Sequence, residues 1–251
     1  MKRMFIAATI VGAFAGPAAA VEPTLVTFDT GREGWQGPQG GGGHSWIAPR
    51  LGNDRPAYRT RFDDFGITFA NSSNPAFVGD YTALPALEIG LDVLTRSILF
   101  SGSEVTRDLI VELRDYDNAP DGYPYVSVWF KLGTLDAGAD GWQSWSVSIA
   151  DTSATALPAG WGGYGAENPV TFEPELPDGR SFASVLAGVD EIAFTTLVPG
   201  FFYGDARFDV AIDNVFLRAA TPVPEPATAA LLALGLAALA VRRRRAAAAR
   251  S

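Results

Sequence analysis

The chain has 251 residues, and its composition already excludes several classes of function. It contains no cysteine and one histidine, His44, which excludes thiol catalysis, thiolate metal sites and any site that needs two imidazoles from one chain. Between Val21 and Ala220, 12 Lys and Arg stand against 27 Asp and Glu, a net charge of −15. Such acidity argues against a nucleic-acid partner, which requires a basic surface. It favours solubility and calcium, and it would repel acidic polymers unless a cation bridges them. No sequence motif indicates an organic cofactor.

The amino terminus has the three parts of a secretory signal peptide. A positive segment at residues 2–3 precedes an apolar segment at 4–15, and Ala18-Ala19-Ala20 supplies small residues for cleavage. Residues 1–20 are therefore predicted to form a signal helix that is removed on export. The alternative is a buried amino-terminal helix, but the Gly-Pro pair at 16–17 would interrupt it.

Residues 21–220 are predicted to form one β domain. Short runs of alternating apolar and polar residues recur between turns rich in Gly and Pro. The predicted strands are 25–28, 66–70, 87–93, 108–114, 125–132, 144–149, 191–197 and 208–218. With about eight to ten strands and no repeat period, the sequence predicts an all-β, two-sheet antiparallel sandwich that buries alternate residues of each strand.

Several segments are expected to lie outside the strands. Gly34 to Trp46 is rich in Gly and too irregular for a strand, Ala156 to Pro177 has the composition of a long surface loop, and 182–187 fits one helical turn. The acidic segment 115–122 resembles an EF-hand loop only in part, because two ligand positions carry Ala and Val. A hairpin loop rich in turn-forming residues is favoured there, and a looser calcium loop is the alternative.

The last residues, 221–251, have the layout of a sorting signal. An acidic, Pro-rich motif is followed by an apolar run of 15 residues, 227–241, and then by a basic cluster. This run is shorter than the roughly 20 residues that cross a bilayer, and the basic cluster is expected to stay cytoplasmic. The motif residues are Val223, Pro224, Glu225 and Pro226, and the basic cluster is Arg242, Arg243, Arg244 and Arg245.

This order closely resembles the PEP-CTERM sorting tail of Gram-negative bacteria. Proteins with this tail are understood to be cleaved at the Pro-Glu-Pro motif by an exosortase, a transpeptidase-like membrane enzyme. The resemblance implies an exosortase partner and a precursor held transiently in the inner membrane, with its domain on the periplasmic side. The mature protein is then expected in the cell envelope, on the surface or in the medium. A permanent single-helix anchor is the alternative.

The region before the tail is similar to a recurring domain of PEP-CTERM exoproteins. Its opening and closing strands also resemble the jelly-roll sandwiches of carbohydrate-binding modules and laminin-type adhesive domains. The resemblance to the exoprotein domain rests on Phe28-Asp29, Gly34-Trp35, Asn74-Pro75-Ala76-Phe77, Gly79-Asp80-Tyr81, Arg114-Asp115-Tyr116-Asp117, the segment 157–165, Val189-Asp190-Glu191-Ile192 and Ile212-Asp213-Asn214-Val215.

The resemblance to carbohydrate-binding sandwiches implies a structural calcium. In that family an acidic residue near the end of the first strand and an Asp in the last strand often share the ion, and the matching residues here are Asp29 and Asp213. Two carboxylates and loop carbonyls can supply the oxygen ligands that calcium needs. The alternative is a turn cap at Asp29 and a solvated Asp213.

Five aromatic residues in Gly- and Pro-rich surroundings are expected to be exposed in loops. Flat exposed rings can stack on the apolar faces of sugars. The alternative is that these rings close the ends of the sandwich. The candidate glycan contacts are Trp35, Trp46, Tyr123, Trp161 and Tyr164.

These observations favour a non-catalytic, exported protein of the envelope or exopolysaccharide matrix that binds glycans and holds a structural calcium. The sequence predicts no catalytic residue, because neighbouring carboxylates such as Asp63 and Asp64 point to opposite faces of a strand. Two distant carboxylates can still meet across the fold, which keeps a glycan-active hydrolase as the second hypothesis. An adhesive or structural protein that binds other proteins is the third.

Overall fold

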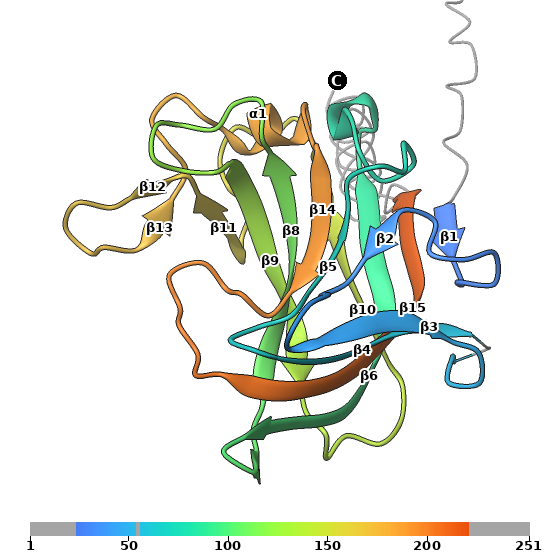
Figure 1. The fold of residues 1–251 in the computed structure, drawn as a ribbon. Coiled ribbons are helices and arrows are strands. Elements are labelled where there is room, and N and C mark those ends of the chain that lie inside the picture. The colour runs from blue at the N-terminus through green and yellow to red at the C-terminus, as the bar shows by residue number, and fades with distance from the viewer. Residues whose placement is uncertain (1–23, 54–55, 221–251) are drawn as a thin grey trace, which may run out of the picture.

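The structure is a computed structural model that describes residues 24–53 and 56–220. These residues form two antiparallel sheets packed face to face and a small two-stranded sheet beside them (Figure 1). Sheet A has the strand order β10-β6-β15-β4-β3, with β1 paired to β15 and β7 to β6. Sheet B has the order β11-β9-β8-β14-β5-β2. This jelly-roll-like sandwich confirms the predicted fold class.

The strands range from two to 14 residues. Sheet A consists of β1 (Thr24–Val26), β3 (Gly43–Ala48), β4 (Ala57–Asp64), β6 (Leu87–Phe100), β7 (Ser103–Glu104), β10 (Gln143–Ile149) and β15 (Ala206–Ala219). Sheet B consists of β2 (Trp35–Gln36), β5 (Thr68–Asn71), β8 (Arg107–Asp115), β9 (Val126–Leu135), β11 (Trp161–Tyr164) and β14 (Glu191–Thr195). The small sheet pairs β12 (Ala166–Glu167) with β13 (Pro174–Glu175).

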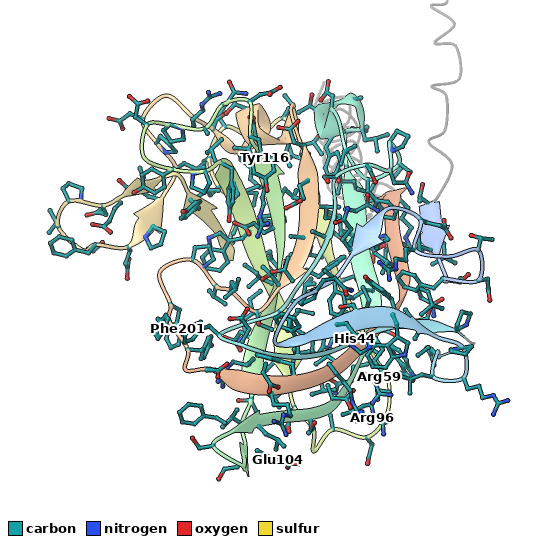
Figure 2. All side chains as sticks on the ribbon, viewed as in Figure 1. His44, Arg59, Arg96, Glu104, Tyr116 and Phe201 are labelled. Atoms are coloured by element: carbon teal, nitrogen blue, oxygen red, sulfur yellow. The ribbon has the colours of Figure 1, made fainter. Side chains whose placement is uncertain are left out.

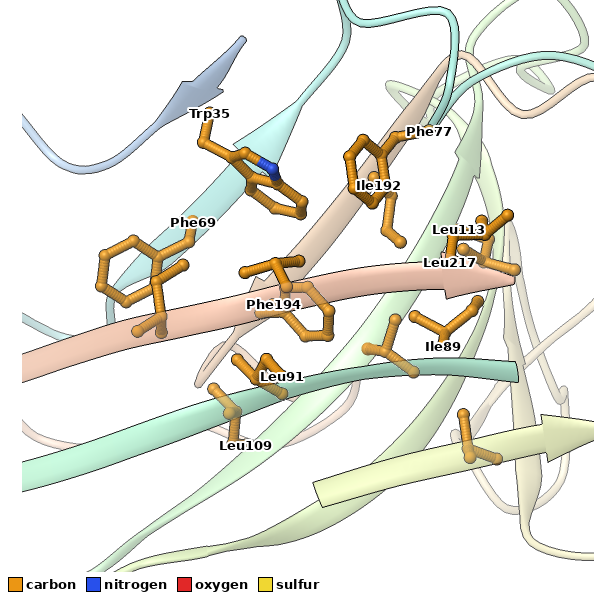
Figure 3. Close-up of a cluster of buried hydrophobic side chains, with 14 of the residues drawn as sticks. Trp35, Phe69, Phe77, Ile89, Leu91, Leu109, Leu113, Ile192, Phe194 and Leu217 are labelled. Atoms are coloured by element: carbon orange, nitrogen blue, oxygen red, sulfur yellow. The ribbon is translucent and has the colours of Figure 1, made fainter. Parts of the chain in front are cut away.

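The core lies between the two sheets and is filled by alternate residues of their strands (Figure 3). On β8, Leu109 and Leu113 point inward, and across the core Ile89 and Leu91 of β6 do the same. All four side chains are at most 1% exposed. Because side chains alternate along a strand, the residues between them point to the outer faces of the sheets, where a binding site can form.

A β-bulge in β15 changes which residues face the core. The pairing with β6 shifts by one residue between Asp213 and Phe216, and Asn214 takes a left-handed backbone conformation with φ 47°. Asn tolerates this conformation better than most residues. As a result, Ile212 faces the core before the bulge and Val215 faces it afterwards.

The predicted strands from β6 onward are found close to their expected positions, but two predicted loops were wrong in part. The segment Gly34 to Trp46 contains β2 and the start of β3, and Ala156 to Pro177 contains β11, β12 and β13. A Cβ on Gly43 would lie 2.0 Å from the carbonyl oxygen of Arg61. The glycines therefore allow close pairing of β3 with β4, a strand that the sequence did not predict.

The helical part of the described structure is small. The predicted turn at 182–187 is the helix α1, Phe182–Leu186, which begins at a capping box made by Ser181 and Ser184. A 3-10 helix, η1, covers Tyr81–Ala83. Within the described residues, no helix is long and apolar enough to cross a membrane. The predicted terminal helices, 1–20 and 227–241, lie outside these residues.

Trp35 and Trp161 are core residues, and the prediction that they are exposed was wrong. The Trp35 side chain is 0% exposed, stacks on Phe194 at 5.5 Å and meets Phe77 edge-on at 5.3 Å. Trp161 is 8% exposed and packs against Phe182 at 5.0 Å.

The glycine beside Trp35 does not indicate a loose loop. A Cβ on Gly34 would lie 2.7 Å from the side-chain oxygen of Asn71, and Gly34 has φ 89°. This glycine is therefore required by close packing of the chain against β5. The alternative that the sequence left open, that these rings close the sandwich, describes Trp35 and Trp161 correctly.

The Trp35→Ala variant is expected to lose about 3–5 kcal/mol of unfolding free energy, because it opens a cavity in the aromatic core. The matched Trp46→Ala variant, at a half-buried position on the outer face of sheet A, is expected to lose only about 1 kcal/mol. Urea unfolding of the full-length chain in mild detergent measures both values. Equal losses in the two variants would contradict this description of the core.

Candidate functional site

A chain of ion pairs lies on the outer face of sheet B. Glu112 and Arg114 alternate with the inward-facing residues of β8, and Glu191 of β14 is the strand partner of Arg114. The guanidinium group of Arg114 donates to Glu112 Oε2 at 2.6 Å and to Glu191 Oε1 at 2.7 Å. One cation therefore holds two carboxylates from neighbouring strands in fixed positions.

The ion-pair chain is buried although it lies on an outer face. The side chains of Glu112 and Arg114 are 1% and 11% exposed, and the Ser127 hydroxyl donates to Glu112 Oε1 at 2.6 Å. Burial opposes the charge of Arg114, but the negative charge of Glu112, followed by smaller contributions that include Glu191, outweighs it and raises the Arg114 pKa. The guanidinium group therefore stays charged and supports the residues that pack above it.

Four tyrosines gather over the ion-pair chain, and we call them the tyrosine cluster: Tyr116, Tyr123, Tyr125 and Tyr164. The Arg114 guanidinium lies 4.8 Å from the ring centre of Tyr125. The Tyr125 ring contacts Tyr116 at 5.4 Å and Tyr164 at 5.2 Å, and Tyr164 contacts Tyr123 at 5.4 Å. The tyrosines come from two separate segments, the β8–β9 connection (residues 116–125) and the end of β11.

The loop between β8 and β9 is fixed by carboxylates. Backbone N–H groups of Tyr116 and Asp117 donate to Asp190 at 2.7 and 3.3 Å, and Asp115 accepts from the backbone and side chain of Asn118. Asp115 is fully buried. The acidic segment 115–122 thus lies at the turn of a β-hairpin, as the favoured interpretation predicted, and its carboxylates order the loop that carries Tyr116.

The environment of Tyr116, Tyr125 and Tyr164 keeps their hydroxyl groups protonated. Burial, followed by the charge of Glu112, raises the Tyr125 pKa. Burial and Glu191 raise the Tyr116 pKa, and burial and Tyr123 raise the Tyr164 pKa. These hydroxyl groups therefore remain hydrogen-bond donors across the physiological pH range.

The cluster offers flat rings with polar edges. The Tyr116 side chain is 42% exposed, and its hydroxyl donates to Glu191 at 3.1 Å (Figure 2). On the same face, the buried indole nitrogen of Trp129 has no hydrogen-bond partner among the described residues. Such a surface can stack on an apolar face of a ring-shaped ligand and exchange hydrogen bonds at its rim.

The structure brings together only two of the five predicted glycan contacts, Tyr123 and Tyr164. Trp46 lies on β3, on the other sheet of the sandwich. Tyr116 and Tyr125 were not predicted as site residues. The alternation of β8 was a usable signal, because it places Glu112 and Arg114 on the polar face of that strand, but no sequence pattern links this face to β11.

The two residues predicted to bind calcium differ in environment. Asp29 is exposed and accepts the Thr27 hydroxyl at 2.8 Å. Asp213 is 1% exposed and accepts the backbone N–H of Asn53 at 2.8 Å, so the expected alternative of a solvated Asp213 was wrong. Across residues 24–53 and 56–220, no three or more His or acidic side chains are grouped to hold a metal ion. Calcium binding by Asp29 and Asp213 stays a prediction.

The Arg114→Met variant is expected to lose about 3–5 kcal/mol of unfolding free energy, because it leaves Glu112 buried without its cation. The double variant Arg114→Met, Glu112→Gln is expected to recover much of this loss, because Glu112, the more deeply buried of the two carboxylates that Arg114 holds, then carries no charge. Urea unfolding of the parent chain, the two single variants Arg114→Met and Glu112→Gln, and the double variant gives the coupling energy directly. Additive losses would show that Arg114 and Glu112 do not form a coupled pair.

Comparisons with known proteins add a sorting signal and a group of solved structures. No curated protein sequence matches this chain. Similar solved structures include an exo-beta-agarase, with 11% identity over 81% of this chain and TM-score 0.47. Another is a xylan-binding domain from carbohydrate-binding module family 22, with 11% identity over 81% of this chain and 97% of that domain and TM-score 0.41.

A third is the family 11 carbohydrate-binding module from Clostridium thermocellum in complex with a beta-1,3-1,4-mixed-linked tetrasaccharide, with 15% identity over 80% of this chain and 98% of that module and TM-score 0.43. The chain spans only 26% of the length of the agarase. Residues 222–245 match the PEP-CTERM protein-sorting motif and lie outside the described residues. The chain therefore carries the sorting motif of an exported, exosortase-processed protein of the cell envelope.

Proposed function

We propose that this protein is a non-catalytic, glycan-binding component of the cell envelope or exopolysaccharide matrix, and that the tyrosine cluster binds the glycan. The observation that carries the proposal is the gathering of four tyrosine rings over a buried ion-pair chain on one face of sheet B. The sorting motif supports the location, because it directs the protein to the envelope.

The chemistry of the cluster suits a neutral sugar. A pyranose ring has an apolar face that stacks on an aromatic ring, and hydroxyl groups at its edge that exchange hydrogen bonds. The hydroxyl groups of Tyr116, Tyr125 and Tyr164 stay protonated and supply donors. Glu112 is buried beneath the rings, and Arg114 neutralises it.

The cluster is also pre-organised. Strand pairing sets the position of Tyr164, the Arg114 guanidinium packs on the ring of Tyr125, and the Asp190 carboxylate holds the loop that carries Tyr116. A rigid site loses little conformational entropy when a ligand binds, which raises affinity without new contacts.

A binding role fits the carboxylates of this face better than catalysis. Glu112 and Glu191 both accept hydrogen bonds from the Arg114 guanidinium, so their oxygen atoms are already held by a cation. A glycoside hydrolase needs one carboxyl group that donates a proton to the leaving group. We therefore infer that a bound glycan leaves the site unchanged.

The full-length chain, in mild detergent, is expected to bind at least one neutral oligosaccharide from a panel of β-linked glucans, xylans and galactans. The Tyr125→Ala and Tyr164→Ala variants are each expected to weaken binding about tenfold or more, because each removes a stacking surface. Isothermal titration calorimetry measures the affinities, and chromatography of the same mixtures detects any shortened product.

The matched control is Tyr203→Ala, which removes a half-buried tyrosine from the β14–β15 loop. It is expected to leave glycan affinity unchanged. Binding that survives both cluster variants, or is lost equally in the control, would refute the assignment of the site. Shortened product would replace the binding role with hydrolysis.

We also propose that calcium stabilises the edge where β1 pairs with β15. Val26 of β1 pairs with Val215, which places Asp29 and Asp213 near the same end of this pairing. Calcium is expected to raise the thermal midpoint of the full-length chain relative to chelator, and Asp213→Ala is expected to remove that rise. An equal calcium response in the Asp213→Ala variant, or no response at all, would exclude this site.

A further inference from the structure

A second cluster of charged residues lies on the outer face of sheet A, opposite the tyrosine cluster. Three arginines surround the carboxylate of Asp209 on β15. Arg59 donates to both of its oxygens at 2.7 and 2.5 Å, Arg61 donates at 3.0 Å, and Arg96 lies at 3.7 Å. We call Arg59, Arg61 and Arg96 the arginine cluster.

Only Arg59 donates hydrogen bonds to both oxygen atoms of this carboxylate. Its side chain is 16% exposed, whereas those of Arg61 and Arg96 are 63% and 47% exposed. Within the described residues, the terminal nitrogen atoms of Arg61 and Arg96 donate no hydrogen bond. Three cations thus share one carboxylate, and the cluster keeps a positive charge and free donors in a domain that is strongly acidic.

A β-bulge turns Arg96 toward this face. Thr95 pairs with Val210 and Ser97 with Asp209, so Arg96 is the extra residue on β6. Bulges of this kind redirect side chains and are frequent beside functional sites.

Two ring-bearing side chains, Trp46 and His44, border the arginine cluster. Trp46 of β3 is the strand partner of Arg59, and its ring lies 5.3 Å from the Arg59 guanidinium. His44, two residues earlier on the same face, lies 4.8 Å from the Trp46 ring. In Figure 2, His44, Arg59 and Arg96 appear on the same side of the molecule. The predicted glycan contact Trp46 therefore belongs to this cluster and not to the tyrosine cluster.

The glycine run before His44 leaves space beside the cluster. Gly40 and Gly43 exchange backbone hydrogen bonds at 3.0 and 3.2 Å and close a tight turn without side chains. A groove of about 460 Å³ lies beside the cluster, and its lining includes His44, Arg61, Asp63, Arg207 and Asp209 but not Trp46, Arg59 or Arg96. This volume lies within the roughly 300–1,000 Å³ of many small-ligand sites.

We propose that the arginine cluster, His44 and Trp46 form a second binding site, for the carboxylate groups of an acidic polysaccharide that contains uronic acids. A uronate carboxylate matches the planar fork of an arginine, and the sugar ring beside it can stack on Trp46. The alternative is that these arginines are ordinary solvent-exposed residues that bind no ligand. It does not account for the bulge at Arg96 or for the two rings beside the cluster.

Other anions fit the site less well. A nucleic acid needs an extended basic surface, whereas this cluster supplies three arginines around one carboxylate. A free phosphate or sulfate would use the guanidinium groups but leave Trp46 without a role. The site therefore combines recognition of charge with recognition of a ring. It lies on the face opposite the tyrosine cluster, so its existence does not depend on the function proposed there.

The test is titration calorimetry of the full-length chain, in mild detergent at low salt, with three probes: an oligogalacturonate, the same oligosaccharide with its carboxyl groups reduced to alcohols, and inorganic phosphate. The oligogalacturonate is expected to bind at least about tenfold more tightly than the other two probes. Its affinity is expected to fall as salt is added, because salt screens the exposed guanidinium groups.

Two variants test the residues. Arg61→Gln, Arg96→Gln is expected to weaken oligogalacturonate binding at least about tenfold, and Trp46→Ala about tenfold. The matched control Arg50→Gln removes an exposed positive charge from beyond the far end of β3 and is expected to leave binding unchanged. The thermal midpoint of the arginine variant is expected to equal that of the parent chain, since both side chains are exposed.

Four results would overturn the proposal. The first is no oligogalacturonate binding by a chain with a normal thermal midpoint. The second is equal affinity for phosphate and oligogalacturonate, with no effect of Trp46→Ala, which would indicate a simple anion site. The third is an equal loss in the Arg50→Gln control, which would indicate non-specific charge attraction. The fourth is loss of acidic-glycan binding in Tyr125→Ala, which would place that ligand at the tyrosine cluster.

Discussion

Strand β15 lies between β4 and β6 and sends alternate side chains to opposite faces of sheet A. This alternation determines which residues form the core and which form the outer face. Phe208, Val210 and Ile212 enter the core, while Asp209 points outward to the arginine cluster. A slip of one residue would exchange the two sets and place a carboxylate in the core, at a cost of several kcal/mol. The register of β15 therefore fixes both the core and the outer face of sheet A.

The same alternation produces the candidate site on sheet B. The inward residues of β8 pack against sheet A, so Glu112 and Arg114 face outward and form the ion-pair chain beneath the tyrosines. The inner face of each sheet thus forms the stabilising core, and the outer face carries the charged and aromatic side chains of a candidate site. The two outer faces differ: that of sheet B carries aromatic rings over a buried ion-pair chain, and that of sheet A carries exposed arginines beside one tryptophan.

The sequence was sufficient to predict the fold class and the long strands, because period-two alternation is a local signal in β6, β8, β9 and β15. It did not predict β3 and β4, where glycines and arginines replace the usual apolar residues. Those arginines are placed on an outer face by pairing with β15, about 150 residues away along the chain. Such long-range pairing leaves no local pattern.

The site residues were harder to predict for a related reason. The Gly-rich surroundings of Trp35 and Trp161 suggested exposed loops, but in the structure Gly34 marks close backbone packing. Tyr123 and Tyr164 were predicted individually, yet their meeting with Tyr116 and Tyr125 depends on the pairing of β11 with β9. The sorting motif was predicted from its own residues alone, since it is read as a linear signal.

The most direct test of the central claim is hydrogen–deuterium exchange of the full-length chain with and without exopolysaccharide purified from the producing cells. Bound glycan is predicted to slow exchange at the start of β9 and along β11, where Tyr125 and Tyr164 lie. The β14–β15 loop is predicted to exchange at an unchanged rate. Protection confined to that loop, or no protection anywhere in the sandwich, would contradict the account of the tyrosine cluster as the glycan-binding site.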